Sequence, residues 1–418
     1  MELLKTLSPK LRRDLLVLFA AGLLFWSGLA ALLPTLPLYI RDAGGTSQAI
    51  GTVMGAFAVG LLVSRPWLAT LADRRGRKIV LLIGISAVAI APLGYLVTNS
   101  IPLLMAIRAF HGISISAFAL AYTALVVDLS PVEHRGELIG YMSLVNPLGL
   151  ALGPAMGGFL QESVGYAPMF LAAATLGGLG WVCTAQVREP EVIRDSLNRR
   201  EDRQFWRSLT SPRIRIPATV LLLIGLAFGT LSTFVPLFIQ EVGVNLNVGL
   251  FYTAAAIASF VIRIIAGRAS DRYGRGLFIT FSLVFYTTAM LLLWQANSTA
   301  TFLLAGTMQG AGAGTLIPMI AALMADRSHA DERGKVFGLC MVGFDVGIAI
   351  AGPLAGAIAT QIGYKSVFGL TAGLAFLSLL VFLTLSSKNL KQSFQFATGR
   401  GEDIYAIKQG LGSAKPLH

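Results

Sequence analysis

The sequence predicts an all-α membrane protein whose twelve transmembrane helices form two six-helix bundles related by a parallel internal repeat. Three observations predict this fold: a high apolar content, twelve apolar segments of membrane-spanning length, and matching residues at one fixed offset between the halves. Apolar residues make up 55% of the 418 residues and charged residues only 13%, against about 25% charged in a soluble domain. A chain of this composition buries its apolar surface in lipid.

The apolar segments are long enough to cross a bilayer as helices. A spanning helix needs about 20 apolar residues, and continuous rather than alternating apolar runs favour helices over a barrel. The first run exceeds the roughly 7–15 apolar residues of a cleaved signal peptide, so we expect it to be the first span. The predicted spans are 15–39, 49–71, 79–97, 101–127, 137–160, 166–187, 217–240, 248–267, 277–295, 300–325, 336–359 and 365–386.

Lysine and arginine residues predict the orientation, because they concentrate in cytoplasmic loops. With a cytoplasmic N-terminus, 28 of the 33 basic residues fall in cytoplasmic segments, and only Arg41 and Lys365 lie on the other side. We therefore expect a multi-pass protein of the plasma (inner) membrane with both termini in the cytoplasm. The predicted parts are the N-terminus (1–14), the first bundle (15–187), a cytoplasmic linker with some surface helix (188–216), the second bundle (217–386) and a loosely ordered cytoplasmic tail (387–418).

The two halves superpose at an offset of 198 residues. The matching pairs are Arg65 and Arg263, Asp73 and Asp271, Gly76 and Gly274, Arg77 and Arg275, Gly112 and Gly310, Asp128 and Asp326, and Gly165 and Gly363. Six spans are an even number, so the second copy enters the membrane from the same side. Transporters with parallel repeats bind substrate near the midplane between the halves.

Two short loops share the pattern Asp-Arg-x-Gly-Arg, in ADRRGRK (72–78) and SDRYGRG (270–276). The glycines permit tight turns, and the arginines can reach an acidic neighbour. Both loops resemble the signature loop of the major facilitator superfamily, a resemblance that covers almost the whole chain. It implies a two-bundle fold, alternating access, and a conformational latch formed by Asp73, Gly76, Arg77 and Asp128, with Asp271, Gly274 and Arg275 in the second copy. The family's motif begins with a glycine; the second copy has Gly267 at that position, whereas the first copy departs from the pattern with Ala69.

The fifth span carries a glycine-rich pattern made of Gly140, Gly149, Gly153, Pro154, Gly157 and Gly158. Small residues four apart let helices approach closely in lipid, and proline bends a helix. The alternative interpretation is ordinary helix packing. The pattern resembles the antiporter motif of drug:proton exchangers in that superfamily, and Pro34 and Pro37 in the first span resemble its twelve-span branch.

Charged residues inside the membrane are costly and therefore candidates for function. Asp345 is the acidic residue nearest mid-membrane and can carry a proton; the alternative is a structural hydrogen bond. Arg108 resembles the arginine of a second family motif tied to proton coupling, and His111 follows it by one turn; both can instead be packed structural residues. Arg65 and Arg263 are expected near the cytoplasmic surface, where they snorkel or support the loops.

Further polar and aromatic residues near mid-span are candidates to line a substrate cavity, although such residues more often pack against lipid or other helices. They are Trp26, Tyr122, Asn146, Phe234, Gln309 and Phe344. The first span lacks an acidic residue, so a neutral, amphipathic or anionic substrate is as open as a cationic one.

The function predicted is secondary active export of a small organic or drug-like solute in exchange for protons, by a monomer embedded in membrane lipid. A facilitator, a proton symporter or a flippase of lipid-like substrates remains an alternative, and a non-transporting receptor is less favoured. The net charge of +12 does not indicate nucleic-acid binding, because the basic residues lie in short loops. We expect no enzyme activity, catalytic residue, cofactor or metal site, because the spans lack ligand or catalytic clusters and Cys183 and Cys340 lie singly within them.

Overall fold

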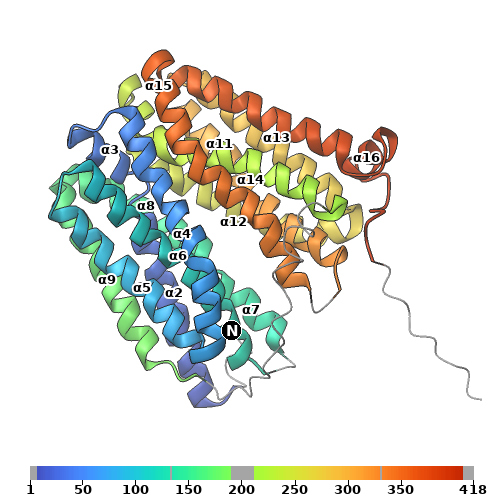
Figure 1. The fold of residues 1–418 in the computed structure, drawn as a ribbon, viewed down its shortest axis with the longest axis horizontal. Helices are drawn as coiled ribbons and strands as arrows, with labels where there is room; N and C mark the ends of the chain where they lie inside the picture. The colour runs from blue at the N-terminus through green and yellow to red at the C-terminus, as the bar shows by residue number, and fades with distance from the viewer. Residues whose placement is uncertain (1–6, 132–133, 190–210, 330–331, 408–418) are drawn as a thin grey trace, which may run out of the picture.

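The computed structural model describes residues 7–131, 134–189, 211–329 and 332–407 (Figure 1). The chain forms helices over most of these residues. In chain order they are α2 (Pro9–Ala30), α3 (Leu36–Asp42), α4 (Ser47–Arg75), α5 (Arg77–Leu96), α6 (Ile101–Leu129), α7 (Arg135–Ser143), α8 (Val145–Val164), α9 (Tyr166–Gln186), α11 (Pro212–Val242), α12 (Val248–Tyr273), α13 (Arg275–Trp294), α14 (Thr299–Asp326), α15 (Arg333–Leu385) and α16 (Leu390–Ala397).

The twelve predicted spans are present as helices. Within the described residues, eleven helical segments are long and apolar enough to cross a membrane, and α15 contains two spans. Gly363 divides α15, because its φ of 77° and ψ of 163° lie outside the helical region. The predicted all-α fold with twelve spans is therefore confirmed.

Two spans are interrupted where proline removes a backbone donor. The first span divides into α2 and α3 around residues 31–35, where Pro34 lies in a turn and Pro37 is in the first turn of α3. The fifth divides into α7 and α8 at Leu144, three residues before Pro147. Each of these spans therefore consists of two consecutive helices.

The internal repeat extends to the backbone conformation of its loops. Gly76 and Gly274 adopt φ values of 108° and 89°, and Gly165 and Gly363 adopt 89° and 77°. Glycine reaches these angles without the steric penalty of a Cβ atom. Each pair is related by the 198-residue offset, so the two halves turn in the same way at the same places.

The described connections at residues 76, 130–131, 274 and 327–329 lie at one end of the helices, which we call the basic end because the sequence segments assigned to this side carry most of the lysines and arginines. The connections at 43–46, 97–100, 165, 243–247, 295–298 and 363 lie at the opposite end. The predicted orientation makes the basic end cytoplasmic, which stays a prediction.

The apolar core joins the two halves at the opposite end. One buried cluster contains residues of the first half alone, such as Leu18, Phe25 and Leu125. A second cluster combines the core of the second half with residues from the opposite end of the first half, including Leu36 and Phe170. Figure 1 shows the two groups of helices meeting near α3 and the bend of α15.

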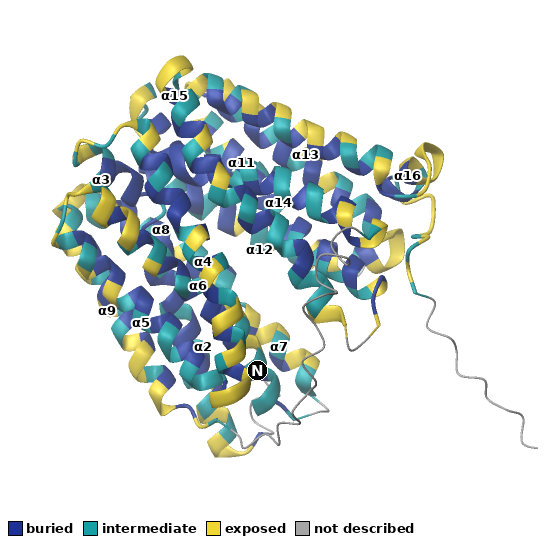
Figure 2. Cartoon of the chain, in the orientation of Figure 1, coloured by how far each residue is buried: buried dark blue, intermediate teal, exposed yellow. Residues whose placement is uncertain are grey.

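Exposed residues lie along the outer faces of the helices, as the yellow segments of Figure 2 show, and many of them are large and apolar. Val63 is 74% exposed and Ile264 is 65% exposed. An exposed apolar band around a helical bundle is the surface that lipid covers.

Residues 390–407 pack against the second half, so the expectation of a loosely ordered tail is wrong for them. Gly276 of α13 lies against the backbone of Phe396 in α16, and Thr280 Oγ1 donates to the Ala397 carbonyl at 2.8 Å. The predicted surface helix of the linker falls largely on residues 190–210, which lie outside the described residues.

Candidate functional site

The two halves contact each other along two symmetric seams at the opposite end. In the α4–α15 seam, Gly51 lies against the Gly352 carbonyl and Gly55 against the Ala349 carbonyl. In the α8–α12 seam, Gly249 lies against the Pro154 carbonyl, and Thr253 Oγ1 donates to the Ala151 carbonyl at 3.0 Å. The contacts at 51 and 352 and at 55 and 349 map onto those at 249 and 154 and at 253 and 151 by the 198-residue offset. A pseudo-twofold relation therefore holds in space as well as in sequence.

An ion pair crosses the α4–α15 seam deeper in the molecule. Arg65 Nη2 of the first half lies 2.9 Å from Asp345 Oδ2 of the second half. The Asp345 side chain is 7% exposed and that of Arg65 is 27% exposed. Asp345 is 12 residues from the start of α15, roughly 18 Å along the helix from the basic end. A charge pair at this depth links the positions of the two halves electrostatically.

Arg108 and His111 lie together inside the first half rather than between the halves. Arg108 Nη1 is 3.4 Å from His111 Nδ1, and the Tyr95 hydroxyl is 3.5 Å from the same nitrogen. The guanidinium also lies 4.4 Å from the centre of the Phe57 ring, a cation–π contact. Because a guanidinium only donates, Nδ1 accepts and the proton of a neutral His111 is on Nε2. Arg108 Nε and His111 Nε2 are buried without a partner among the described residues.

The first signature loop holds the basic end of the first half together. Arg77 Nε is 3.4 Å from Asp128 Oδ2, so α5 and α6 are joined by the pair of residues that the family resemblance implies. The Arg77 amide donates to Glu189 Oε1 at 2.6 Å, which places a carboxylate at the N-terminus of α5. An anion at a helix N-terminus is stabilised by the unpaired amides and the helix dipole. Whether this loop acts as a latch stays a prediction.

The glycine-rich pattern of α8 permits close packing on α2. A Cβ atom on Gly149, Gly153 or Gly157 would overlap Trp26, Ser27 or Ala31 of the first span. Gly158 instead faces Asn247 and Gly249 of the second half. The pattern therefore brings α8 close to both its own bundle and the other one, while Gly140 in α7 has open space around it.

Comparison with known families identifies the fold and its general activity. The family model described as Major Facilitator Superfamily matches residues 18–285 and 246–402, which together cover most of the chain. The chain belongs to the Major Facilitator Superfamily. It is therefore a non-enzymatic, multi-pass membrane transporter of small molecules.

Two curated relatives are drug-resistance proteins. The quinolone resistance protein NorA of Staphylococcus aureus (strain MSSA476) is 25% identical over 353 residues, which cover 83% of this chain and 90% of that protein. The multidrug resistance protein MdtG of Escherichia coli O6:K15:H31 (strain 536 / UPEC) is 27% identical over 381 residues, 87% of this chain and 91% of that protein. The crystal structure of a mutant of the nucleoside transporter NupG superposes with a TM-score of 0.77 at 14% identity, covering 88% of this chain and 99% of that one. It supports the fold alone.

Three of the residues predicted to line a substrate cavity pack against other aromatic side chains. Tyr122 is buried, stacks on Phe118 and donates to the Met142 carbonyl at 3.3 Å. Phe234 is fully buried and stacks on Tyr364. Trp26 packs edge-on against Phe118 and its indole Nε1 has no partner among the described residues. Contact of any of them with substrate stays a prediction.

The other three predicted cavity residues lie in α8, α14 and α15. Gln309 is 5% exposed and Phe344 is 9% exposed. Phe344 packs near the Phe228 ring, with the ring centres 5.7 Å apart. Asn146 is half-buried in the first turn of α8. Their role in binding substrate also stays a prediction.

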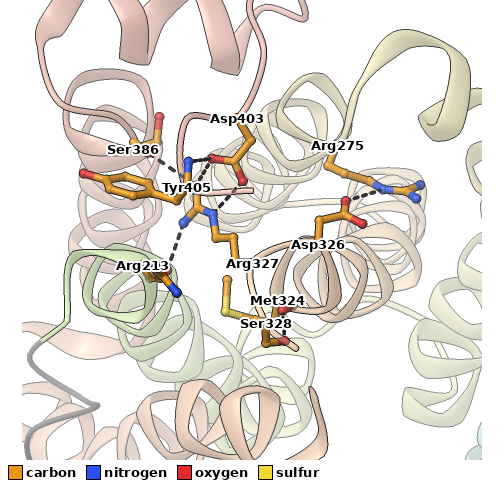
Figure 3. A network of polar contacts seen from close by, with 9 residues as sticks. All are labelled: Arg213, Arg275, Met324, Asp326, Arg327, Ser328, Ser386, Asp403 and Tyr405. Carbon is orange, nitrogen blue, oxygen red and sulfur yellow. Dashed lines mark hydrogen bonds and ion pairs between the residues drawn. The ribbon is translucent and has the colours of Figure 1, made fainter. Parts of the chain in front are cut away.

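The second signature loop lies beside the tail, which binds to the end of α14 (Figure 3). Arg275 pairs with Asp271 at 2.5 Å and with Asp326 at 3.5 Å. The residue after Asp326, Arg327, is buried and forms two bonds to Asp403, at 2.7 and 2.9 Å. The Tyr405 ring lies 5.0 Å from the Arg327 guanidinium. The tail is thereby bound beside Asp326, the partner of Arg275 at the end of α14.

Sequence reasoning missed Arg65 as the partner of Asp345 and Asp403 as the partner of Arg327. Both pairs join residues far apart along the chain, so no local pattern indicates them. The signal available for Arg65 was its place on the repeat, which puts a basic residue at the same position in spans 2 and 8.

Proposed function

We propose that this transporter exports a small organic, drug-like solute in exchange for protons, with Asp345 as the proton-binding group. The observation that carries the proposal is the ion pair between Asp345 and Arg65, because it joins a mid-membrane carboxylate to the other half of the transporter. The drug-resistance proteins among the relatives support a drug-like solute.

The ion pair supplies a physical route from proton binding to movement of the halves. A proton on Asp345 removes its negative charge and with it the attraction that holds Arg65 across the seam. The halves can then separate more easily at this point, and loss of the proton restores the attraction. Coupling of this kind requires that Asp345 binds the proton with different affinities in the conformation with the seam closed and in the conformation with the seam open.

Transport in proteoliposomes with an imposed pH gradient tests the coupling. We expect Asp345→Asn, which keeps the size of the side chain, to abolish stimulation by the gradient while solute exchange without a gradient continues. Asp345→Glu, which keeps the carboxyl group, is the matched control and should retain stimulation. Transport by Asp345→Asn that still follows the gradient would refute the role of Asp345.

The direction of solute accumulation distinguishes the exporter from a symporter, a facilitator or a flippase of the same fold. In vesicles with a known orientation, a proton-coupled exporter moves solute in the direction opposite to the proton flow and accumulates it on one side. A facilitator only equalises the solute concentration on the two sides. The same preparation tests the proposed inner-membrane orientation with cytoplasmic termini, through protease access to the tail. The molecular mass of the purified protein in detergent tests the proposal that it is a monomer.

A further inference from the structure

We infer that Arg263 binds an anionic group, such as a carboxylate, of the transported solute; this inference rests on the proposed transport of a small organic solute. Arg263 has no established role in the chain and is the repeat counterpart of Arg65. Its surroundings, within the described residues, differ from those of Arg65 in the one respect that matters for ligand binding, the absence of an acidic partner.

The charges inside the membrane leave Arg263 uncompensated. The charged residues inside the predicted spans, apart from the first and last residues of each span, are Arg65, Arg108, Arg263 and Asp345. Asp345 is paired with Arg65. Within the described residues, neither Arg108 nor Arg263 forms an ion pair with a carboxylate, and the Nε atom of each is buried without a hydrogen-bond partner. A guanidinium whose Nε is buried without a hydrogen-bond partner is unfavourable unless an anion or a polar group completes it.

The pseudo-twofold relation explains why Arg263 lacks a partner in the described part of the chain. The offset that maps the contacts of one seam onto the other also maps Arg65 onto Arg263 and Asp345 onto Pro147. Proline has no side-chain acceptor, and Pro147 is buried in α8. At the position where the α4–α15 seam has an internal carboxylate, the α8–α12 seam has a proline, so a carboxylate from outside the protein can occupy the equivalent place.

The faces of α12 indicate the direction in which Arg263 projects. Gly249 and Thr253 face α8, and Ser259 and Ile262 face α14, where they lie against Gly314. At about 100° per residue, Arg263 lies about 40° from both Gly249 and Ser259, between these two faces. The exposed residues of the lipid-facing side are Ile257, Val261, Ile264 and Ile265. Arg263 therefore projects toward the interior between α8 and α14 and away from lipid.

Arg108 is a weaker candidate for the same role. Its guanidinium lies over the Phe57 ring and beside His111, inside the first half. Arg263 is half-buried and projects between α8 of the first half and α14 of the second half. It is therefore better placed than Arg108 for a ligand that contacts both halves during transport. An arginine fork also matches a carboxylate in two-point geometry better than a lysine does.

Binding of a charge series to the purified full-length protein in detergent tests the inference. The probes are 2-naphthoate, its neutral amide 2-naphthamide, and 2-naphthylmethylammonium, which share the aromatic ring and differ in charge. We expect 2-naphthoate to bind most tightly. Arg263→Gln should weaken its binding about 10- to 100-fold, as loss of a charge-assisted hydrogen bond does, and leave 2-naphthamide unchanged. Arg263→Lys should give an intermediate affinity.

Arg215→Gln is the matched control, because Arg215 is exposed on α11 of the same half. It should not change binding of any probe, and thermal unfolding checks that each variant is folded. Equal binding of the three probes, no binding of 2-naphthoate, or an equal loss of naphthoate and naphthamide binding in Arg263→Gln would overturn the inference. The assay uses no pH gradient, so its failure is distinguishable from a failure of proton-coupled export.

Discussion

Adding a methyl group to the glycines of the α4–α15 seam should weaken closure at the opposite end. A Cβ on Gly55 would lie 2.7 Å from the Ala349 carbonyl oxygen and 2.9 Å from Pro353 Cδ, and a Cβ on Gly51 would overlap the Gly352 carbonyl. Overpacking of this kind costs roughly 1–3 kcal/mol, which corresponds to a shift of roughly 5- to 150-fold between the closed and open arrangements. We expect Gly51→Ala to have the larger effect, because its Cβ would overlap the Gly352 carbonyl more closely than a Cβ on Gly55 approaches the Ala349 carbonyl.

Gly178→Ala is the matched control, because a Cβ at this position of α9 meets nothing within 4 Å. It should stabilise the helix by about 1 kcal/mol at most and leave the seam unchanged. Both seam variants and the control are conservative in size, so differences among them report on the contact between the halves rather than on helix formation.

Distances between spin labels on the two halves measure the effect directly. Ser100 and Lys365 are exposed at the opposite end, one in each half, and can carry the labels as cysteines after Cys183 and Cys340 are replaced. Gly51→Ala should add a longer-distance population that Gly178→Ala lacks, and transport should fall in parallel. An unchanged distance distribution together with normal transport in Gly51→Ala would refute the argument that this seam closes the transporter.

Two further predictions concern the ion pairs at the basic end. Asp403→Asn removes the carboxylate that neutralises the buried Arg327 guanidinium and should lower the free energy of unfolding by about 3–5 kcal/mol. Glu402→Gln, at the exposed neighbouring position, should change it by less than about 0.5 kcal/mol. Equal melting temperatures for the two variants would show that the tail contact contributes nothing. Arg77→Gln and Asp128→Asn should each slow solute exchange. The double variant should be no slower than the slower of the two single variants, because the two residues act as one ion pair. Additive losses in the double variant would argue against a direct interaction.

The sequence by itself determined the spans, the repeat and the family. Continuous apolar runs of about 20 residues specify membrane helices in any tertiary context, since the lipid leaves the backbone no alternative partner. Gly76 and Gly274 predicted the tight turns of the two signature loops, and both adopt the positive φ angles that suit glycine above other residues. Gly165 and Gly363 were recognised only as a matching pair of the repeat, and the structure shows that Gly363 separates two spans that follow each other without a loop.

Only the tertiary structure decided which charges are paired. Arg65 and Arg263 occupy equivalent places in the repeat, yet among the described residues Arg65 pairs with Asp345 and Arg263 has no carboxylate partner. The tail looked unstructured because its helix α16 is short and polar on one side, but buried contacts with Arg327 and α13 order it. The physical reason is the same in both cases. Whether a buried charge is neutralised depends on the atoms that packing brings within about 4 Å of it. In this fold those atoms come from the other half of the repeat, for Arg65, or from the C-terminal tail, for Arg327.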